Sequence, residues 1–352
     1  MNQNRKICSP TNLNLPSVVG YPLSFVIQND EKHQKNLLIA SNSGLHHVRM
    51  ESRDDVEYVR ALKFGVCMGV VLIDRTENIT ENAEAKLGNP YFLAAVFSTN
   101  ADRLGRDATA DILFFQKAVL DIGSDRKPDY RMTCDREWGR VRRIIYSGAL
   151  NSIFMSTKFD HDFRGKYQSS SVWVLPLDST GDASKPCPMA SRIIHKKPGN
   201  IRFIAINNWG DLLAIADLTD DRAHYVDLHD AKTGHCLFQI SHGGSRKAFW
   251  APVGQVHFPR GMAFDSNDRL FIVDETKRVQ KFDIPKNKCD GIVFIPKFSD
   301  PIALAVNEKE LYVIGSNEKQ TRGFSFVSHS RRKGIQSKYS IQKGTYLTIY
   351  DM

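Results

Sequence analysis

The stretch FPRGMAFDSNDRLFIVDETKRVQKFD, residues 258–283, decides the fold class of this chain. Two short apolar runs, at 262–264 and 270–273, flank a polar turn at 265–268. A third run, at 279–282, alternates between apolar and polar residues. Short runs of β-branched and aromatic residues, separated by Asp, Asn and Ser, are typical of consecutive antiparallel strands. The stretch therefore predicts three strands joined by tight turns.

The same unit recurs along the chain. Six times an apolar run and a polar turn lead into a second apolar run, and the second runs begin near Leu37, Phe92, Ile153, Leu212, Leu270 and Leu311. Repetition about every 40–60 residues, with several strands per unit, is typical of a β-propeller. The first two runs are mostly apolar on both sides, as expected of strands buried between neighbouring blades. The sequence predicts an all-β fold, a six-bladed β-propeller of four-stranded antiparallel blades.

We expect one domain over residues 1–352, because no linker interrupts the repeats. The predicted blades cover about 20–65, 66–130, 131–190, 191–245, 246–296 and 297–352. A closed ring leaves no unpaired edge strand that would invite aggregation. The run at 345–350 alternates cleanly and is a candidate closing strand, and 13–19 is a candidate for the same terminal blade. Which terminus supplies which strand stays open at this point.

The quoted stretch also carries a family pattern. A Pro-x-Gly step at Pro259 and Gly261 leads into an apolar strand that ends at Asp265, a second strand ends at Asp274, and Arg-Val-Gln-Lys-Phe follows at 278–282. This pattern resembles the NHL repeat. The resemblance implies a six-bladed propeller, and single-stranded RNA is a candidate ligand because some NHL propellers bind RNA.

The NHL pattern has a physical basis. Gly261 allows the chain to enter the innermost strand where backbones crowd around the channel. Asp265 and Asp274 suit strand ends, because a carboxylate there accepts hydrogen bonds from nearby backbone N–H groups. The repeats at 201–217 and 301–315 match the pattern only in part.

The charge favours acidic partners. The chain has 48 Lys and Arg residues against 39 Asp and Glu residues, which gives a formal net charge of +9. A surplus of this sign attracts polyanions and acidic proteins but does not determine the fold.

The cysteines argue against a structural zinc site. The six residues Cys8, Cys67, Cys134, Cys187, Cys236 and Cys289 are scattered, and no CxxC pair occurs. Separate reduced thiols fit the cytoplasm, with the nucleus as the alternative. No apolar run reaches the roughly 18 residues of a membrane-spanning helix. The N-terminal sequence lacks the apolar core of a secretory signal. We expect a cytoplasmic or nuclear protein with no membrane contact and no cofactor.

A binding face is predicted from the loops. In a propeller, the segments that lead into the inner strands and the loops between second and third strands share one side of the disc, here called the top face. Several of these segments are basic and contain aromatic residues. The predicted binding residues are Arg142, Arg143, Lys196, Lys197, Arg202, Trp250, His257, Arg260 and Lys277.

Two kinds of partner fit such a face. An acidic protein or peptide is the favoured partner, so the chain is interpreted as a non-enzymatic scaffold for protein–protein interaction. Single-stranded RNA is the alternative, because cations bind phosphates and planar side chains stack on unpaired bases. Acidic residues predicted on the same face count against a simple phosphate platform; they are Asp217, Asp220, Asp221, Asp274 and Glu275.

A catalytic interpretation is also open. Six-bladed sugar-lactone hydrolases hold a divalent cation near the channel, and Asn207, Asp265 and Asn307 occupy equivalent strand ends here. They are the candidate metal ligands of a lactonase-like hydrolase at the channel mouth. Equivalent positions are also what a repeated structural turn produces. The sequence contains no GxSxG motif and no Walker-type loop, so we predict no catalytic residues.

Overall fold

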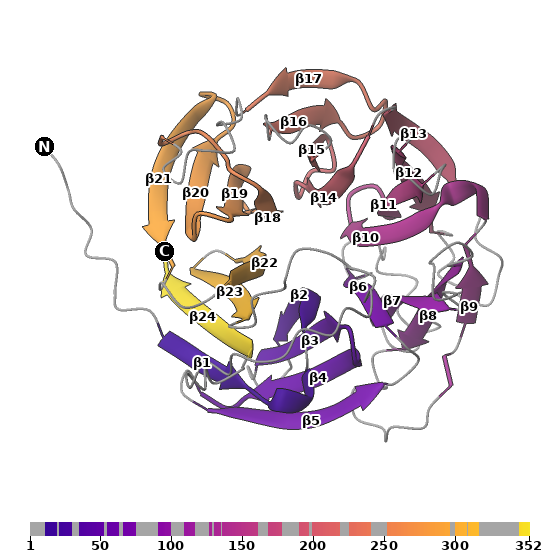
Figure 1. Cartoon of the computed structure of the whole chain (residues 1–352), viewed down its shortest axis with the longest axis vertical. Coiled ribbons are helices and arrows are strands. Elements are labelled where there is room, and N and C mark those ends of the chain that lie inside the picture. Colours follow the sequence, from indigo (N-terminus) through magenta and orange to yellow (C-terminus); the bar gives the residue numbers. More distant parts are fainter. Residues whose placement is uncertain are drawn as a thin grey trace, which may run out of the picture.

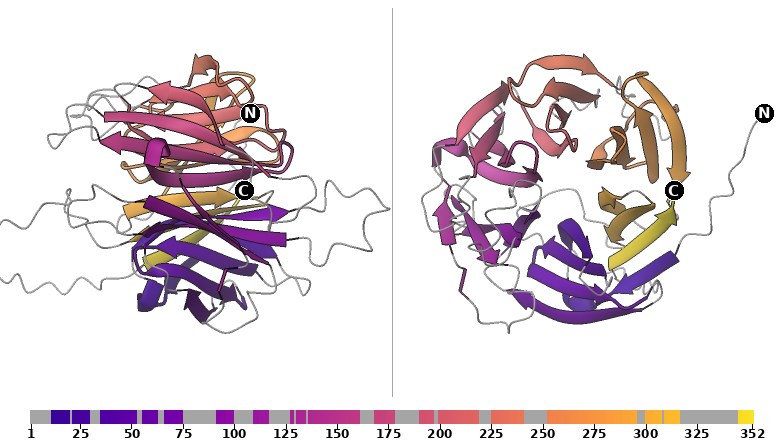
Figure 2. Two further views of the ribbon diagram at one scale, coloured as in Figure 1. Left: turned by 90° about the vertical axis from the view of Figure 1, so that its right-hand side faces the viewer. Right: turned by 180° about the vertical axis from the view of Figure 1, so that it is seen from behind.

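The structure is a computed structural model. It describes residues 11–19, 21–29, 35–52, 55–62, 66–74, 91–99, 109–116, 127–128, 130–134, 136–160, 168–177, 190–196, 199–218, 225–240, 252–295, 300–307, 309–316 and 345–352. Their strands form six four-stranded antiparallel sheets around a central channel (Figure 1). Seen from the side, the ring is a disc (Figure 2). The predicted all-β propeller with four-stranded antiparallel blades is confirmed.

The sheets, numbered here as blades in chain order, contain the following strands. Blade 1 holds β2 (Pro22–Asn29), β3 (Lys35–Ser41), β4 (Gly44–Met50) and β5 (Val56–Leu62). Blade 2 holds β6 (Val66–Asp74), β7 (Tyr91–Thr99), β8 (Thr109–Gln116) and β9 (Tyr130–Thr133). Blade 3 holds β10 (Arg140–Ser147), β11 (Ser152–Asp160), β12 (Gln168–Pro176) and β13 (Ser191–Lys196).

The remaining blades follow the same plan. Blade 4 holds β14 (Ile201–Ile206), β15 (Leu212–Asp217), β16 (Tyr225–Asp230) and β17 (Cys236–Gln239). Blade 5 holds β18 (Pro259–Phe264), β19 (Arg269–Asp274), β20 (Arg278–Asp283) and β21 (Lys288–Phe294). Blade 6 holds β22 (Asp300–Val306), β23 (Glu310–Ser316), β24 (Thr345–Asp351) and β1 (Thr11–Leu15). Two 3₁₀ turns are described, η1 (Ser17–Val19) and η4 (Arg136–Trp138).

Blade 6 settles the roles of the two termini. Its strand order is β22-β23-β24-β1, so the C-terminal strand is third from the channel and the N-terminal strand is outermost. The register runs from Thr11 opposite Ile349 to Leu15 opposite Thr345. Leu13 and Leu15 are buried against blade 1 residues in the same core cluster. The ring is therefore closed by backbone pairing between segments from opposite ends of the chain.

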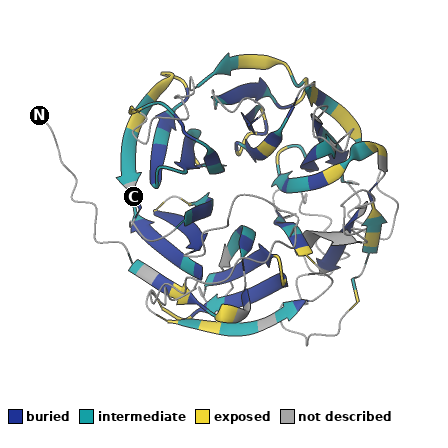
Figure 3. Ribbon diagram, in the orientation of Figure 1, coloured by how far each residue is buried: buried dark blue, intermediate teal, exposed yellow. Residues whose placement is uncertain are grey.

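Burial decreases from the middle of each blade to its rim. The second strand β15 has one half-buried residue followed by five buried ones, whereas the outer strand β13 has three exposed residues and a single buried one. Figure 3 shows the same gradient around the ring. Two predicted boundaries differ for this reason. The sequence pattern assigned 131–133 to the third blade and 191–196 to the fourth, but β9 pairs with β8 of blade 2 and β13 pairs with β12 of blade 3. A polar rim strand leaves little apolar pattern by which to place it.

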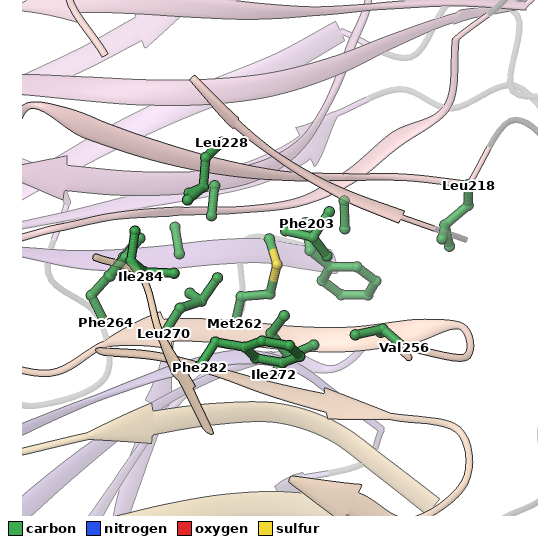
Figure 4. Packing of buried hydrophobic residues seen from close by; sticks show 14 residues of the cluster. Phe203, Leu218, Leu228, Val256, Met262, Phe264, Leu270, Ile272, Phe282 and Ile284 are labelled. Atoms are coloured by element: carbon green, nitrogen blue, oxygen red, sulfur yellow. The ribbon is translucent and has the colours of Figure 1, made fainter. Parts of the chain in front are cut away.

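Apolar side chains fill the space between neighbouring blades. In one core cluster, Phe203 of blade 4 and Met262 of blade 5 are buried together with Leu228 and Ile272 (Figure 4). Burying a side chain of this size contributes roughly 1.5–3 kcal/mol relative to exposure. Interlocked contacts of this kind stabilise each blade against its neighbours.

Gly261 lies where the inner strands of blades 5 and 6 approach closely. A Cβ atom on Gly261 would lie 3.0 Å from the Cα of Ala303 and 3.0 Å from the amide nitrogen of Leu304, both in β22. These are backbone atoms, so they cannot move aside without shifting the strand. The crowding that the sequence predicted at Gly261 is present.

We therefore predict that Gly261→Ala destabilises the chain by about 1–3 kcal/mol, because the new methyl group overpacks the contact between blades 5 and 6. Thermal and urea unfolding monitor the change. Gly291→Ala is the control, since its Cβ would meet only the flexible Lys281 side chain, at 3.6 Å. Equal stability losses in the two variants would contradict the proposed crowding.

Candidate functional site

Every inner strand carries a β-bulge close to its first residue. At this point the register with the second strand skips one residue. The skipped residues are Leu23, Met68, Arg142, Arg202, Arg260 and Ile302. Bulges re-aim side chains at the rims of barrel-like structures. Here a bulge occurs in every blade at the top end of the channel. The skipped residue is an arginine in blades 3, 4 and 5 and an apolar residue in blades 6, 1 and 2.

The arginines gather at the mouth of the channel. The channel has a volume of about 320 Å³, and Arg143 and Arg260 are among its lining residues. Its wall is otherwise largely apolar and includes Phe25, Ile144 and Met262. Arg202, at the bulge between these two in blade order, is exposed. A channel with apolar walls and cations at one end suits a ligand that has an anionic group beside an apolar one.

Phe203 holds two of the arginines in place. The guanidinium carbon of Arg143 lies 5.1 Å from the centre of the Phe203 ring, and that of Arg202 lies 5.8 Å from it. Both distances are within the range of a cation–π interaction. Arg143 also donates from Nη1 to the carbonyl oxygen of Met68, at 3.2 Å. Arg142 donates from Nη1 to Oδ1 of Asn200, at 3.2 Å, so it is turned toward the loop before blade 4.

The three guanidinium groups affect one another electrostatically. Burial, and secondarily the charge of Arg202, lowers the pKa of Arg143 to about 10. Although Arg202 is exposed as a residue, loss of hydration where its guanidinium group lies against Phe203 lowers the pKa of Arg202 as well, and the charge of Arg260 lowers it further. Burial raises the pKa of Tyr21, which also feels the charges of all three arginines and of Asp300. We call Tyr21, Arg143, Arg202, Arg260, Glu275 and Asp300 the channel-mouth cluster.

The acidic members only partly neutralise the cluster. Arg260 donates from Nη2 to Oε1 of Glu275, at 3.2 Å. Burial raises the pKa of Asp300, with the charge of Glu275 acting in the same direction and Arg260 and Lys277 against it. Within the described part of the chain, Arg143 and Arg202 form no ion pair with a carboxylate. An anionic ligand would relieve this accumulation of positive charge.

The structure places the other predicted binding residues differently. Lys196 ends β13 and forms ion pairs with Asp227, at 2.7 Å, and with Asp217, at 3.6 Å. His257 is only 8% exposed, and its ring packs edge-on against Phe258. Lys277 lies in the turn between β19 and β20, near Asp300. Lys197 and Trp250 lie outside the described residues. The structure therefore brings together Arg143, Arg202, Arg260 and Lys277, and leaves Lys196 and His257 in other environments.

Two acidic residues predicted on the top face have internal roles. Asp217 is buried, and its Oδ1 accepts from the backbone N–H of Asn200. Asp274 is also buried and accepts from the backbone N–H of Thr276 and from Nε of Arg278. Their charges are thus used inside the fold and do not oppose a ligand at the mouth. Asp220 and Asp221 lie outside the described residues.

The candidate metal ligands of the hydrolase interpretation form repeated turns. Asn207 accepts through Oδ1 from the backbone N–H of Asp211 and Leu212. Asp265 and Asn307 accept backbone N–H groups in the same way in blades 5 and 6. All three stand between the first and second strands of their blades, on the face opposite the channel mouth. Their oxygens cap turns, which is the structural role that the sequence left open.

Sequence reasoning missed two members of the cluster and its geometry. Tyr21 precedes β2 and Asp300 begins β22, and neither stands in a basic segment. The positions of the bulges could not be predicted either, because they depend on how the first strand of each blade pairs with the second. The signal that could have been used is the position of Arg142, Arg202 and Arg260, each just before the first apolar run of its repeat.

Comparisons with known proteins add little to this picture. No family model matches the chain. No curated protein matches it either. Among solved structures, the chain is similar to the crystal structure of the WD40 beta propeller domain of Doa1, with 10% sequence identity and a TM-score of 0.48 over 94% of this chain and 93% of that chain. The propeller assignment rests on the strands and sheets of the chain itself.

The described residues contain no helix with the length and apolar character needed to cross a membrane.

We predict that Asp300→Asn stabilises the chain at pH 7. Because the folded-state pKa of Asp300 is raised, the folded state binds its proton more tightly than the unfolded state, and the charged carboxylate disfavours folding above that pKa. The advantage of Asn should shrink as the pH falls through the folded pKa toward the ordinary value near 4. Thermal unfolding of the wild-type chain and of Asp300→Asn between pH 4 and pH 8 measures this difference in stability.

Asp283→Asn is the control with the opposite sign. Its side-chain hydrogen bond with Lys286 lowers the pKa of Asp283, so its replacement should not stabilise the chain at pH 7. A destabilised Asp300→Asn variant at pH 7, or a difference from the wild type that does not change with pH, would contradict the assignment.

Proposed function

We propose that the chain is a non-enzymatic binding scaffold that holds an acidic segment of a partner protein at the channel-mouth cluster. One observation carries the proposal: the first residues of the inner strands of three consecutive blades bring Arg143, Arg202 and Arg260 to one end of a channel whose other lining side chains are mostly apolar. The guanidinium group presents paired N–H donors that match the two oxygens of a carboxylate. A rigid inner strand holds each of the three arginines, so little entropy is lost when they bind a ligand.

The walls of the channel suggest a second element of recognition. Farther along the inner strands the lining includes Val26, Val71 and Leu304, which are apolar. A volume of about 320 Å³ admits one or two side chains and not a folded element. We therefore propose an extended peptide in which an acidic residue stands next to an apolar residue. The carboxylate would contact Arg202 and Arg143, and the apolar side chain would enter the channel.

Single-stranded RNA is less well supported by the described residues. Base stacking needs an accessible aromatic face. Phe203 is only 5% exposed and lies under two arginines, and Trp250 is outside the described residues. The resemblance of 258–283 to an NHL repeat fits either ligand, and we keep it as an interpretation of that blade. RNA binding is thus an outcome of the test below and not part of the proposal.

We predict that Arg202→Gln weakens binding of a fluorescent hexaglutamate peptide about ten- to a hundredfold, the value of one charge-assisted hydrogen-bonded pair. Fluorescence anisotropy at low ionic strength measures the affinity, and added salt should weaken it. Hexaglutamine should bind much more weakly than hexaglutamate to the wild-type chain.

Lys309→Gln is the matched control for charge. Lys309 is exposed in the turn between β22 and β23, on the opposite face, so its loss removes one positive charge without touching the cluster. Equal weakening by both substitutions would show that only net charge matters and would contradict the site. Stronger binding of an oligouridylate than of hexaglutamate, with the same dependence on Arg202, would assign the cluster to RNA instead.

A further inference from the structure

A second group of polar side chains lies away from the channel, on the outer half of blade 4. Asp227 and His229 are two residues apart in β16, so both point to the same side of the sheet. Cys236 opens β17 and stands directly opposite His229 in the register. One ligand atom from each of the three residues lies within 4.8 Å of the other two.

His229 carries a buried lone pair that no described group uses. The side chain is 4% exposed, and Nδ1 is 2.9 Å from the carbonyl oxygen of Gly234. A carbonyl only accepts, so Nδ1 carries the proton and Nε2 is left as an acceptor. Within the described chain, Nε2 is buried and has no hydrogen-bond partner. A buried acceptor without a hydrogen bond lowers the stability of the fold by roughly 1–3 kcal/mol unless a donor or a metal ion binds it.

The loop that orients His229 is itself fixed. Asp230 accepts hydrogen bonds from the backbone N–H groups of Lys232 and Thr233 and from the Thr233 hydroxyl. Gly234 has a φ of 75°. A Cβ there would lie 2.3 Å from the carbonyl oxygen of Ile193, so only glycine fits. Metal-binding histidines characteristically donate their second ring N–H to a carbonyl or carboxylate of this kind.

Hydrogen bonds from neighbouring side chains also hold the Asp227 carboxylate in place. Its Oδ2 accepts from Nζ of Lys196, at 2.7 Å, and its Oδ1 accepts from Nε2 of Gln239, at 3.1 Å. Each carboxylate oxygen retains a second lone pair for a further bond. Cys236 is exposed and is a free cysteine, so the group is open to solvent on one side.

We infer that Asp227, His229 and Cys236 form a binding site for a divalent transition-metal ion of the Zn²⁺ class. Sulfur, imidazole nitrogen and carboxylate oxygen are the ligands that Zn²⁺ takes in proteins, and three of them leave a fourth position for water. Tetrahedral bonds to these atoms need donors about 3.5 Å apart, so the group must contract slightly, and exposed Cys236 can move inward. On binding, the thiol releases its proton to the buffer.

The sequence could not show this site. Its ligands follow the spacing Asp-x-His-x₆-Cys, which contains no close cysteine pair. Only the register between β16 and β17 brings the sulfur opposite the imidazole. The site goes beyond the proposed function and does not depend on it, because it lies on a different part of the blade.

The test is titration of the reduced, metal-free full chain with Co²⁺, followed by absorption spectroscopy. We expect saturation at one Co²⁺ per chain, with a thiolate-to-cobalt charge-transfer band and the visible bands of a four-coordinate ion. Zn²⁺ should displace the cobalt and should raise the melting temperature. His229→Gln should weaken Co²⁺ binding more than about tenfold, in line with the loss of a ligand.

Cys236→Ser and Cys289→Ser form the decisive pair, because Cys236 is exposed and Cys289 is a half-buried cysteine outside the group. The band should vanish in Cys236→Ser and persist in Cys289→Ser. Absence of a charge-transfer band in the wild-type chain would overturn the inference. Persistence of the band in Cys236→Ser would overturn it as well, since another cysteine would then be the ligand.

Discussion

Backbone pairing between β1 and β24 is the interaction on which the rest of the structure depends. Five residue pairs join the two ends of the described chain, and Leu13 and Leu15 are buried against the neighbouring blade. Without this pairing, β24 would be an open edge, and blade 6 would lose its outer strand. Closure also fixes the distances between the inner strands, and these distances determine which residues meet around the channel.

The functional proposal follows from that geometry. Once the ring is closed, the first residues of the inner strands surround the top end of the channel, and in blades 4 and 5 the bulge residue there is an arginine. Close contacts such as Gly261 against Ala303 leave no room for the strands to shift. The arginines are therefore held near one another even though their charges repel. The fold supplies the free energy that assembles the cluster, and an anionic ligand would recover part of it.

Sequence reasoning recovered the features that depend on local pattern. Apolar runs and polar turns predicted the strands of a four-stranded propeller, and the role of Gly261 followed from its place before a buried strand. Features that depend on pairing between strands were not accessible. The assignment of β13 to blade 3 and the Asp227–His229–Cys236 group both follow from register. Basic residues in a segment predict a basic face. Only the structure shows that Lys196 pairs with Asp227, whereas Arg202 forms no ion pair with any carboxylate that the structure describes.

Amide hydrogen exchange over residues 345–351 tests ring closure most directly. In the intact chain, the β24 amides that face β1 should exchange as slowly as those that face β23. In a chain that lacks residues 1–16, the amides facing β1 should lose their protection, while β10–β12 of blade 3 stay protected. Rapid exchange of β24 in the intact chain, or unchanged protection after the deletion, would contradict closure by the two ends of the chain.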